Sequence, residues 1–147
     1  MELRTDKIRA CFDRKIGNFT ELWNLSTNTN YVRCAPRDPL IELYGLKNGE
    51  RVKLSGHISD VAEAPDALIL SYDSFGEYDI SAKVTCRCEQ DRLVFSAEIC
   101  NHSTIDVTEI LMPHLGGIYL GNGQKDYLIY PHLSLIHISE PTRLGMI

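Results

Sequence analysis

Two neighbouring stretches with a strict two-residue period, residues 78–88 and 92–101, limit what this chain can fold into. Their alternate apolar positions are Ile80, Ala82, Val84, Cys86 and Cys88 in the first stretch and Leu93, Phe95, Ala97 and Ile99 in the second. Successive side chains of a strand point to opposite faces, so this period predicts two half-buried strands. A short polar turn containing Asp91 joins them into a long antiparallel hairpin, and its apolar face requires a second layer.

Short strands separated by turn residues are expected along the rest of the chain as far as His132. The predicted strands cover residues 7–12, 19–24, 40–44, 51–54, 67–72 and 105–112. Asn48 and Gly49 form a strong hairpin signal, and Gly17 and Asn18 suit a turn with positive φ. No stretch has a convincing 3.6-residue apolar period, so the sequence predicts an all-β, antiparallel β-sandwich without long helices.

We expect strands along the whole chain to contribute residues to the core of this sandwich. The predicted core residues are Phe12, Leu22, Leu43, Leu54, Leu68, Leu70, Val84, Phe95, Ala97, Ile99, Ile110 and Leu115. Each is apolar and lies in or beside a predicted strand, where one face must be buried.

The charge pattern excludes some partners. The 147 residues carry a formal net charge of -5, with acidic and basic residues interspersed and no basic stripe, so a nucleic-acid partner is not expected. No apolar run is long enough to cross a membrane. The charged N-terminal residues 1–7 lack the apolar segment of a signal peptide, which predicts either a start internal to the mature protein or a cytoplasmic protein, and we expect the latter.

The five cysteines argue against a closed disulfide framework, because their number is odd. Cys86 and Cys88 lie on the same face of one predicted strand, which is either half of a metal site or a pair of buried thiols. No second Cys or His pair has zinc-finger spacing, so we expect buried thiols in a reducing compartment and neither a metal nor a cofactor.

Candidate carbohydrate-binding residues are Trp23 and Tyr31, since aromatic rings beside polar turns can stack on sugars. The alternative for Trp23, which we favour, is an aromatic residue of the core. Asp73, Glu77 and Asp79 cluster before the central hairpin, and paired carboxylates can serve glycoside hydrolysis. Acidic residues at a turn are more often simply solvated, and the histidines are scattered turn or surface residues. The sequence therefore predicts no catalytic residue.

The order of several motifs resembles one family. Residues 12–24 are similar to an opening hairpin with a Lys-x-Gly turn, residues 96–103 to a strand ending in Asn-x-Ser, residues 110–117 to a strand ending in Pro-x-Leu-Gly-Gly, and residues 126–132 to one ending in Tyr-Pro-His. In this order they resemble the N-terminal, galactose-mutarotase-like supersandwich of bacterial glycoside-hydrolase-like proteins. The resemblance spans most of residues 7–132.

In that family a (β/α)-barrel follows the supersandwich and carries the catalytic carboxylates. This chain is shorter than such a supersandwich, so the resemblance implies an incomplete supersandwich in residues 1–132 and transfers no catalytic residue. It implies a non-catalytic accessory domain of a carbohydrate-active enzyme, inactive alone, whose partner is the missing C-terminal barrel of its own chain. The alternative is a free-standing carbohydrate-binding or adhesion module.

The last segment, residues 133–147, is expected to be a non-native tail. Residues 133–143 are the translation of a single reading frame of DNA that resembles the transposon end and read primer of a common sequencing-library adapter. The alternative is a native strand over residues 133–138, which the apolar pattern also allows. On the adapter interpretation, the natural sequence is cut at or near His132.

Overall fold

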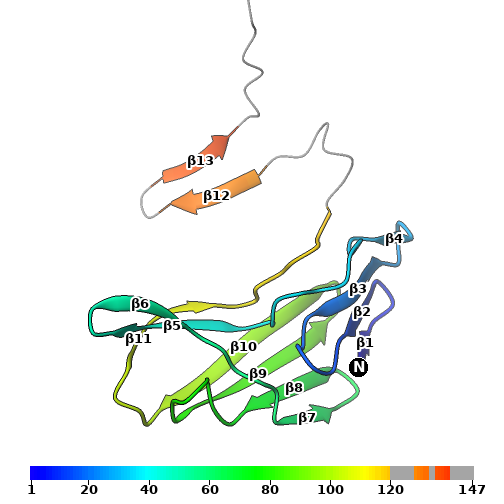
Figure 1. Cartoon of the computed structure of the whole chain (residues 1–147). Coiled ribbons are helices and arrows are strands. Elements are labelled where there is room, and N and C mark those ends of the chain that lie inside the picture. The colour runs from blue at the N-terminus through cyan, green and yellow to red at the C-terminus, as the bar shows by residue number, and fades with distance from the viewer. Residues whose placement is uncertain (120–127, 133–134, 140–147) are drawn as a thin grey trace, which may run out of the picture.

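The computed structural model describes residues 1–119, 128–132 and 135–139, and all regular secondary structure in them is β-strand. The strands are β1 (Glu2–Arg4), β2 (Ile8–Phe12), β3 (Phe19–Asn24), β4 (Thr29–Asn30), β5 (Glu42–Lys47), β6 (Glu50–Leu54), β7 (Asp60–Glu63), β8 (Ala67–Tyr72), β9 (Ile80–Glu89), β10 (Arg92–Asn101), β11 (Asp106–Leu111), β12 (Leu128–His132) and β13 (Leu135–Ser139). All pairs between strands are antiparallel (Figure 1). The all-β, antiparallel architecture predicted from the alternating pattern is confirmed.

The predicted hairpin forms one side of the sheet ordered β10-β9-β8-β7. β9 pairs with β10 along its whole length, and its other side pairs with β8, where Leu68 lies opposite Cys86 and Leu70 opposite Val84. Burial alternates along β9 as the sequence pattern requires. The hairpin turns at Gln90, whose φ of 51° is the left-handed conformation that tight hairpins need.

A second sheet, ordered β1-β2-β3-β4, lies against the apolar face of the first. The rings of Phe12 and Phe19 bring β2 and β3 together, with centroids 4.7 Å apart. β1 is a strand that the sequence did not indicate, because three residues, of which only Leu3 is apolar, are too short for a visible period. Its Leu3 pairs with Ala10, and both side chains are buried in the core.

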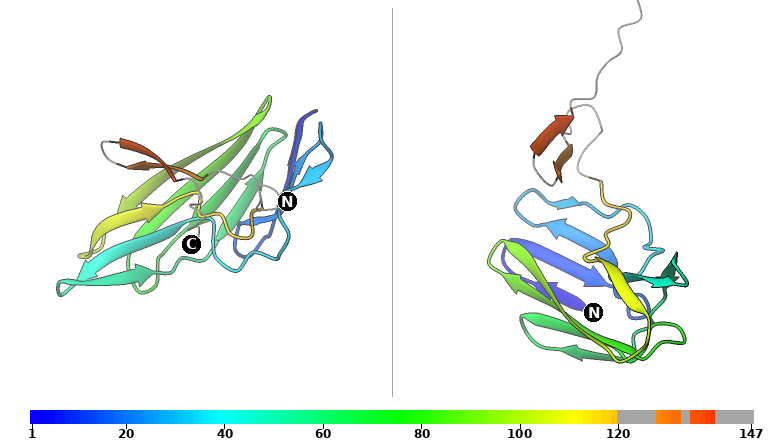
Figure 2. Two further views of the ribbon diagram at one scale, coloured as in Figure 1. Left: turned by 90° about the horizontal axis from the view of Figure 1, so that it is seen from above. Right: turned by 90° about the vertical axis from the view of Figure 1, so that its left-hand side faces the viewer.

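The third sheet has the order β11-β5-β6. The predicted Asn48-Gly49 turn joins β5 to β6, and both residues have positive φ, 54° and 83°. Leu43 of β5 pairs with Leu54 of β6, and both are almost completely buried. Figures 1 and 2 show this sheet beside β1–β4, so that both of these sheets face the β10-β9-β8-β7 sheet. A single apolar cluster includes residues of all three sheets.

Six of the twelve predicted core residues are buried: Phe12, Leu43, Leu54, Leu68, Leu70 and Val84. Four others, Leu22, Phe95, Ala97 and Ile99, are half-buried and pack against the core. The prediction is wrong for Ile110 and Leu115, which are 51% and 42% exposed. Ile110 lies on an edge strand of the three-stranded sheet, and Leu115 lies in an irregular segment beside an open groove, so neither side chain has a covering layer.

β12 and β13 pair with each other, with Tyr130 opposite His137. The apolar residues of the tail could add a strand to an open sheet edge through backbone hydrogen bonds, but β13 pairs with β12 instead. Proline cannot continue a strand ladder, so Pro141 is predicted to end a strand in the tail, and it lies outside the described residues. No helix in the described part of the chain is long and apolar enough to cross a membrane.

Candidate functional site

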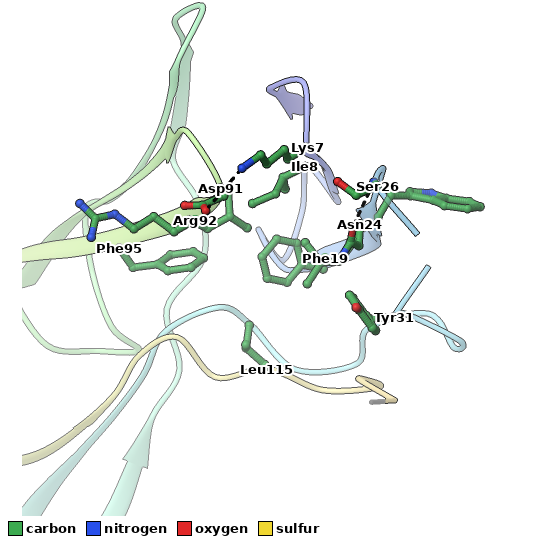
Figure 3. Close-up of a pocket in the computed structure, with 13 residues that line it drawn as sticks. Lys7, Ile8, Phe19, Asn24, Ser26, Tyr31, Asp91, Arg92, Phe95 and Leu115 are labelled. Atoms are coloured by element: carbon green, nitrogen blue, oxygen red, sulfur yellow. Dashed lines mark hydrogen bonds and ion pairs between the residues drawn. The ribbon is translucent and has the colours of Figure 1, made fainter. Parts of the chain in front are cut away.

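An open groove of about 400 Å³ lies between β3 and the start of β10 (Figure 3). This volume is within the range of about 300–1,000 Å³ typical of small-molecule sites. Its walls come from the β1–β2 connection, β3, the β9–β10 turn and the irregular segment after β11. Segments that are distant in sequence therefore meet there.

Aromatic side chains form the inner part of the groove. Phe19 is 1% exposed, and its ring meets the ring of Phe95 edge to face, with centroids 6.1 Å apart and planes at 85°. Leu22 and Leu93 extend the apolar lining from β3 and β10, and Leu115 closes it from the segment after β11. A register shift between Cys11 and Phe12 in the β2–β3 pairing lets Phe19 and Leu22, three positions apart, share the inward face of β3. Regular alternation along β10 places Leu93 and Phe95 on its inward face.

Polar groups surround this apolar interior. Lys7 and Asp91 form an ion pair across one end, with Nζ and Oδ2 3.7 Å apart, and link the β1–β2 and β9–β10 turns. Asn24 and Ser26 line the opposite side, where the Asn24 side chain accepts a hydrogen bond from the Ser26 amide at 3.0 Å. The groove therefore combines an apolar interior with hydrogen-bonding groups at its opening, as small-molecule sites do.

Both predicted carbohydrate-binding residues, Trp23 and Tyr31, line this groove. Tyr31 is half-buried, and its backbone is fixed by a 2.8 Å hydrogen bond from its amide to the carbonyl oxygen of Leu22. Trp23 is also half-buried, but it follows the inward-facing Leu22 and so belongs to the outer face of β3. There its indole Nε1 donates a 2.9 Å hydrogen bond to Glu21. Tyr31 is thus a wall of the groove, whereas Trp23 contributes to its rim and is not the core aromatic that we favoured.

The acidic cluster before the central hairpin does not form a buried pair of carboxylates. Asp73, Glu77 and Asp79 are all exposed. Glu77 accepts a 2.8 Å hydrogen bond from Lys47, which lowers the pKa of its carboxyl group. The interpretation of these residues as solvated turn acids agrees with their positions.

Cys86 and Cys88 are buried, at 1% and 9% exposure, in the face of β9 that packs on the core. Burial raises the pKa of both thiols, that of Cys86 to about 12. No group of three metal-ligating side chains occurs in the described residues. The two thiols thus occupy the positions expected of small core hydrophobes.

A second polar cluster, which sequence reasoning missed, surrounds Glu42 on β5. This carboxylate is 3% exposed and accepts hydrogen bonds from Lys53 and from the Tyr44 hydroxyl, the latter at 3.0 Å. His114 Nδ1 lies 3.4 Å from the same carboxylate, so His114 is not the freely exposed histidine that we expected. The only signal in the sequence is one acidic residue inside the apolar run at residues 40–44. Because its partners occupy the carboxylate, this cluster offers no open position for a ligand.

The fold and the groove define the chain as an antiparallel β-sandwich with an open, aromatic-lined site at one end. No known protein family, curated protein or solved structure matches it.

Proposed function

We propose that this chain is a non-catalytic module of a carbohydrate-active, glycoside-hydrolase-like protein, and that the groove between β3 and β10 binds carbohydrate. The observation that supports the proposal is the combination of half-buried aromatic rings, including Tyr31, with a rim that carries Asn24, Ser26 and Asp91. A pyranose ring has an apolar face of C–H groups and an edge of hydroxyl groups. Aromatic walls can stack on that face while amide and carboxylate groups bind the hydroxyls.

The exposure of Trp23 and Tyr31 bears on the choice between two kinds of module. A domain that only supports a catalytic partner should pack both rings inside, whereas a sugar-binding module should present at least one of them in a concave surface. Both rings are half-buried and line the groove. This geometry favours carbohydrate contact by the module itself.

The larger protein is part of the proposal. The resemblance of residues 7–132 to an N-terminal supersandwich supports a parent enzyme in which a C-terminal barrel carries the catalytic residues. On this proposal the present chain has no activity alone. We place it in the cytoplasm, supported by five free cysteines, of which Cys34 and Cys100 are exposed.

The single tryptophan provides the first test. Because Trp23 lies at the rim of the groove, binding of an oligosaccharide should change its fluorescence emission. Titration of the ¹⁵N-labelled protein with a panel of gluco-, galacto-, manno- and xylo-oligosaccharides should shift the amide signals of Lys7, Asn24, Tyr31 and Leu93. Millimolar affinity is expected, because the site is small and open.

Tyr31→Ala should weaken binding at least about tenfold by removing one stacking wall. Tyr119→Ala is the matched control. Tyr119 is 48% exposed, and its backbone amide donates a hydrogen bond to the carbonyl oxygen of Tyr31, but its side chain does not line the groove. Absence of signal changes with every sugar would contradict the proposal. So would hydrolysis of an aryl glycoside by this chain that is lost in Glu77→Gln or Asp79→Asn.

A further inference from the structure

The outer edge of β10 carries an unpaired row of backbone groups next to an apolar face. Among the residues that the structure describes, β10 pairs only with β9 and ends its sheet. Leu93, Phe95, Ala97 and Ile99 point to the inner face, and all four are only half-buried. An edge of this length, with apolar residues at alternate positions, is a template for another strand.

The backbone hydrogen bonds around β9 and β10 show which residues of β10 offer their backbone groups to a new strand. The amide of Cys88 bonds to Asp66 on the β8 side, and Cys88 pairs with Leu93. The amide of His102, just after β10, bonds to Asp79 beside the start of β9. Along a strand, the amide and carbonyl groups of successive residues point alternately to its two sides. The even-numbered residues of β10 therefore hydrogen-bond to β9. The amide and carbonyl groups of Phe95 and Ala97 therefore point away from the sheet.

We propose that β10 pairs with β10 of a second copy of this chain, antiparallel and centred on Phe95, to give a two-fold dimer with one continuous sheet. In this register Phe95 lies opposite the partner's Phe95, and Leu93 opposite the partner's Ala97. All these side chains remain on the apolar inner face, because antiparallel partners directly opposite each other share a face. The inference is independent of carbohydrate binding.

Charge complementarity identifies both the occupant and the register. Arg92 and Glu98 are the only charged residues of β10, and both are exposed on its outer face. Centring the pair on Phe95 puts Arg92 opposite the partner's Glu98, and Glu98 opposite the partner's Arg92. Centring it on Glu98 would put two carboxylates together, and centring it on Ser96 or Ala97 would leave both charges without an opposite charge across the interface.

The neighbouring strand extends this match. Within one chain, Arg92 pairs with Glu89, with side-chain nitrogen and oxygen 3.0 Å apart, and Glu98 lies opposite Lys83. Across the dimer, the row would run Glu89, Arg92, the partner's Glu98, the partner's Lys83, with the sign of the charge alternating at each step. Opposite charges facing each other across strands are favourable, and like charges are unfavourable.

Two charge-reversal variants test the proposal, first by the self-association of each variant and then by the association of the two when they are mixed. Arg92→Glu would place two carboxylates opposite each other at both ends of the interface, and Glu98→Arg two guanidinium groups. Each variant should weaken self-association at least about tenfold in sedimentation equilibrium. Mixing the two variants should restore the dimer as a heterodimer, because each mutated position then faces an opposite charge.

Circular dichroism first checks that each variant is folded, and Arg37→Glu, an exposed charge reversal away from β10, is the matched control. Hydrogen exchange supplies a second readout. The amides of Phe95 and Ala97 should become protected as the wild-type concentration rises, whereas that of Ser96 should be protected throughout. A wild-type protein that stays monomeric at millimolar concentration would overturn the proposal. A dimer that survives both charge reversals, or variants that do not associate when mixed, would overturn it as well.

Discussion

Asn18 and His114 are 96 positions apart in the chain, and the side-chain amide of Asn18 donates a 2.8 Å hydrogen bond to the carbonyl oxygen of His114. The same amide donates to the carbonyl oxygen of Asp38 at 2.9 Å, and the Asn18 side-chain oxygen accepts from the Phe19 amide at 2.8 Å. Asn18 is 1% exposed. It thus joins the β2–β3 turn to the irregular segments around Asp38 and His114.

Asn18→Ala should lower the free energy of unfolding by about 3 kcal/mol, because it leaves buried backbone groups without partners. Urea denaturation measures this loss. Asn18→Asp has almost the same shape but turns a carboxylate oxygen toward two carbonyl oxygens, so it should be at least as destabilising. A loss of less than about 1 kcal/mol in both variants would mean that this link contributes little to the fold.

Tyr72→Phe should leave stability unchanged or raise it by up to about 1 kcal/mol. The Tyr72 hydroxyl is buried without a hydrogen-bond partner in the described residues, and burial raises the pKa of this phenol to about 12. Its ring stacks on Phe75, with centroids 5.5 Å apart, and phenylalanine keeps that contact. Thermal unfolding gives the comparison, with Tyr72→Ala as the variant that should lose about 3–5 kcal/mol. Marked destabilisation by Tyr72→Phe would refute the assignment of an unpartnered hydroxyl.

The Glu42 cluster predicts an acid-sensitive contribution to stability. Burial alone would raise the pKa of Glu42, but hydrogen bonds from Lys53 and Tyr44, together with the electrostatic effects of the nearby His114 and Lys53, outweigh burial and hold this pKa below its ordinary value of 4.5. A carboxyl group with a lowered folded-state pKa stabilises the fold above its unfolded-state pKa. That contribution is lost as the pH falls from about 4.5 through the folded-state value.

Glu42→Gln should therefore destabilise the protein at pH 7 by about 2 kcal/mol, and the difference from wild type should shrink as the pH falls below about 4.5. Urea denaturation across the range from pH 7 to pH 3 measures both effects. The difference between the two proteins isolates Glu42 from other carboxylates, such as Glu2, whose pKa is lowered by Arg9. A difference that stays constant over this range would contradict the assigned role of Glu42.

The five cysteines should differ in reactivity toward a thiol reagent such as Ellman's reagent. Cys34 and Cys100 are exposed and should react first in the native protein. Cys86 is 1% exposed with its pKa raised to about 12 by burial, so it should react only after unfolding. Cys34→Ser combined with Cys100→Ser should remove the fast phase. Rapid labelling of Cys86 in the native state would show that β9 opens readily.

Removal of residues 133–147 should change the free energy of unfolding of the sandwich by less than about 1 kcal/mol. β13 pairs with β12 in the structure, and Ile136→Asp should have an equally small effect. Leu70→Ala, in the core, is the comparison and should lose about 2–5 kcal/mol. A loss of several kcal/mol on truncation would identify the tail as a folded part of the protein. Amplification of genomic DNA across the His132 codon checks its origin independently.

The sequence by itself determined the longer strands and the faces that they bury, although not the short β1. The alternation in residues 80–88 predicted the burial pattern of β9, and Asn48-Gly49 predicted the β5–β6 turn. Both are local signals, since the side-chain period of a strand and the φ preference of a turn residue depend on few neighbours. The same reasoning failed for Asn18, which was expected at positive φ and is instead a buried hydrogen-bonding residue.

Only the tertiary structure decided which apolar faces are covered and which polar residues meet. Ile110 and Leu115 carry the same apolar signal as Leu43, yet their exposure depends on whether another layer lies above them. The contact between Glu42 and His114 and the groove between β3 and β10 join segments far apart in sequence. Such meetings depend on how the sheets pack against one another, and no local pattern encodes that packing.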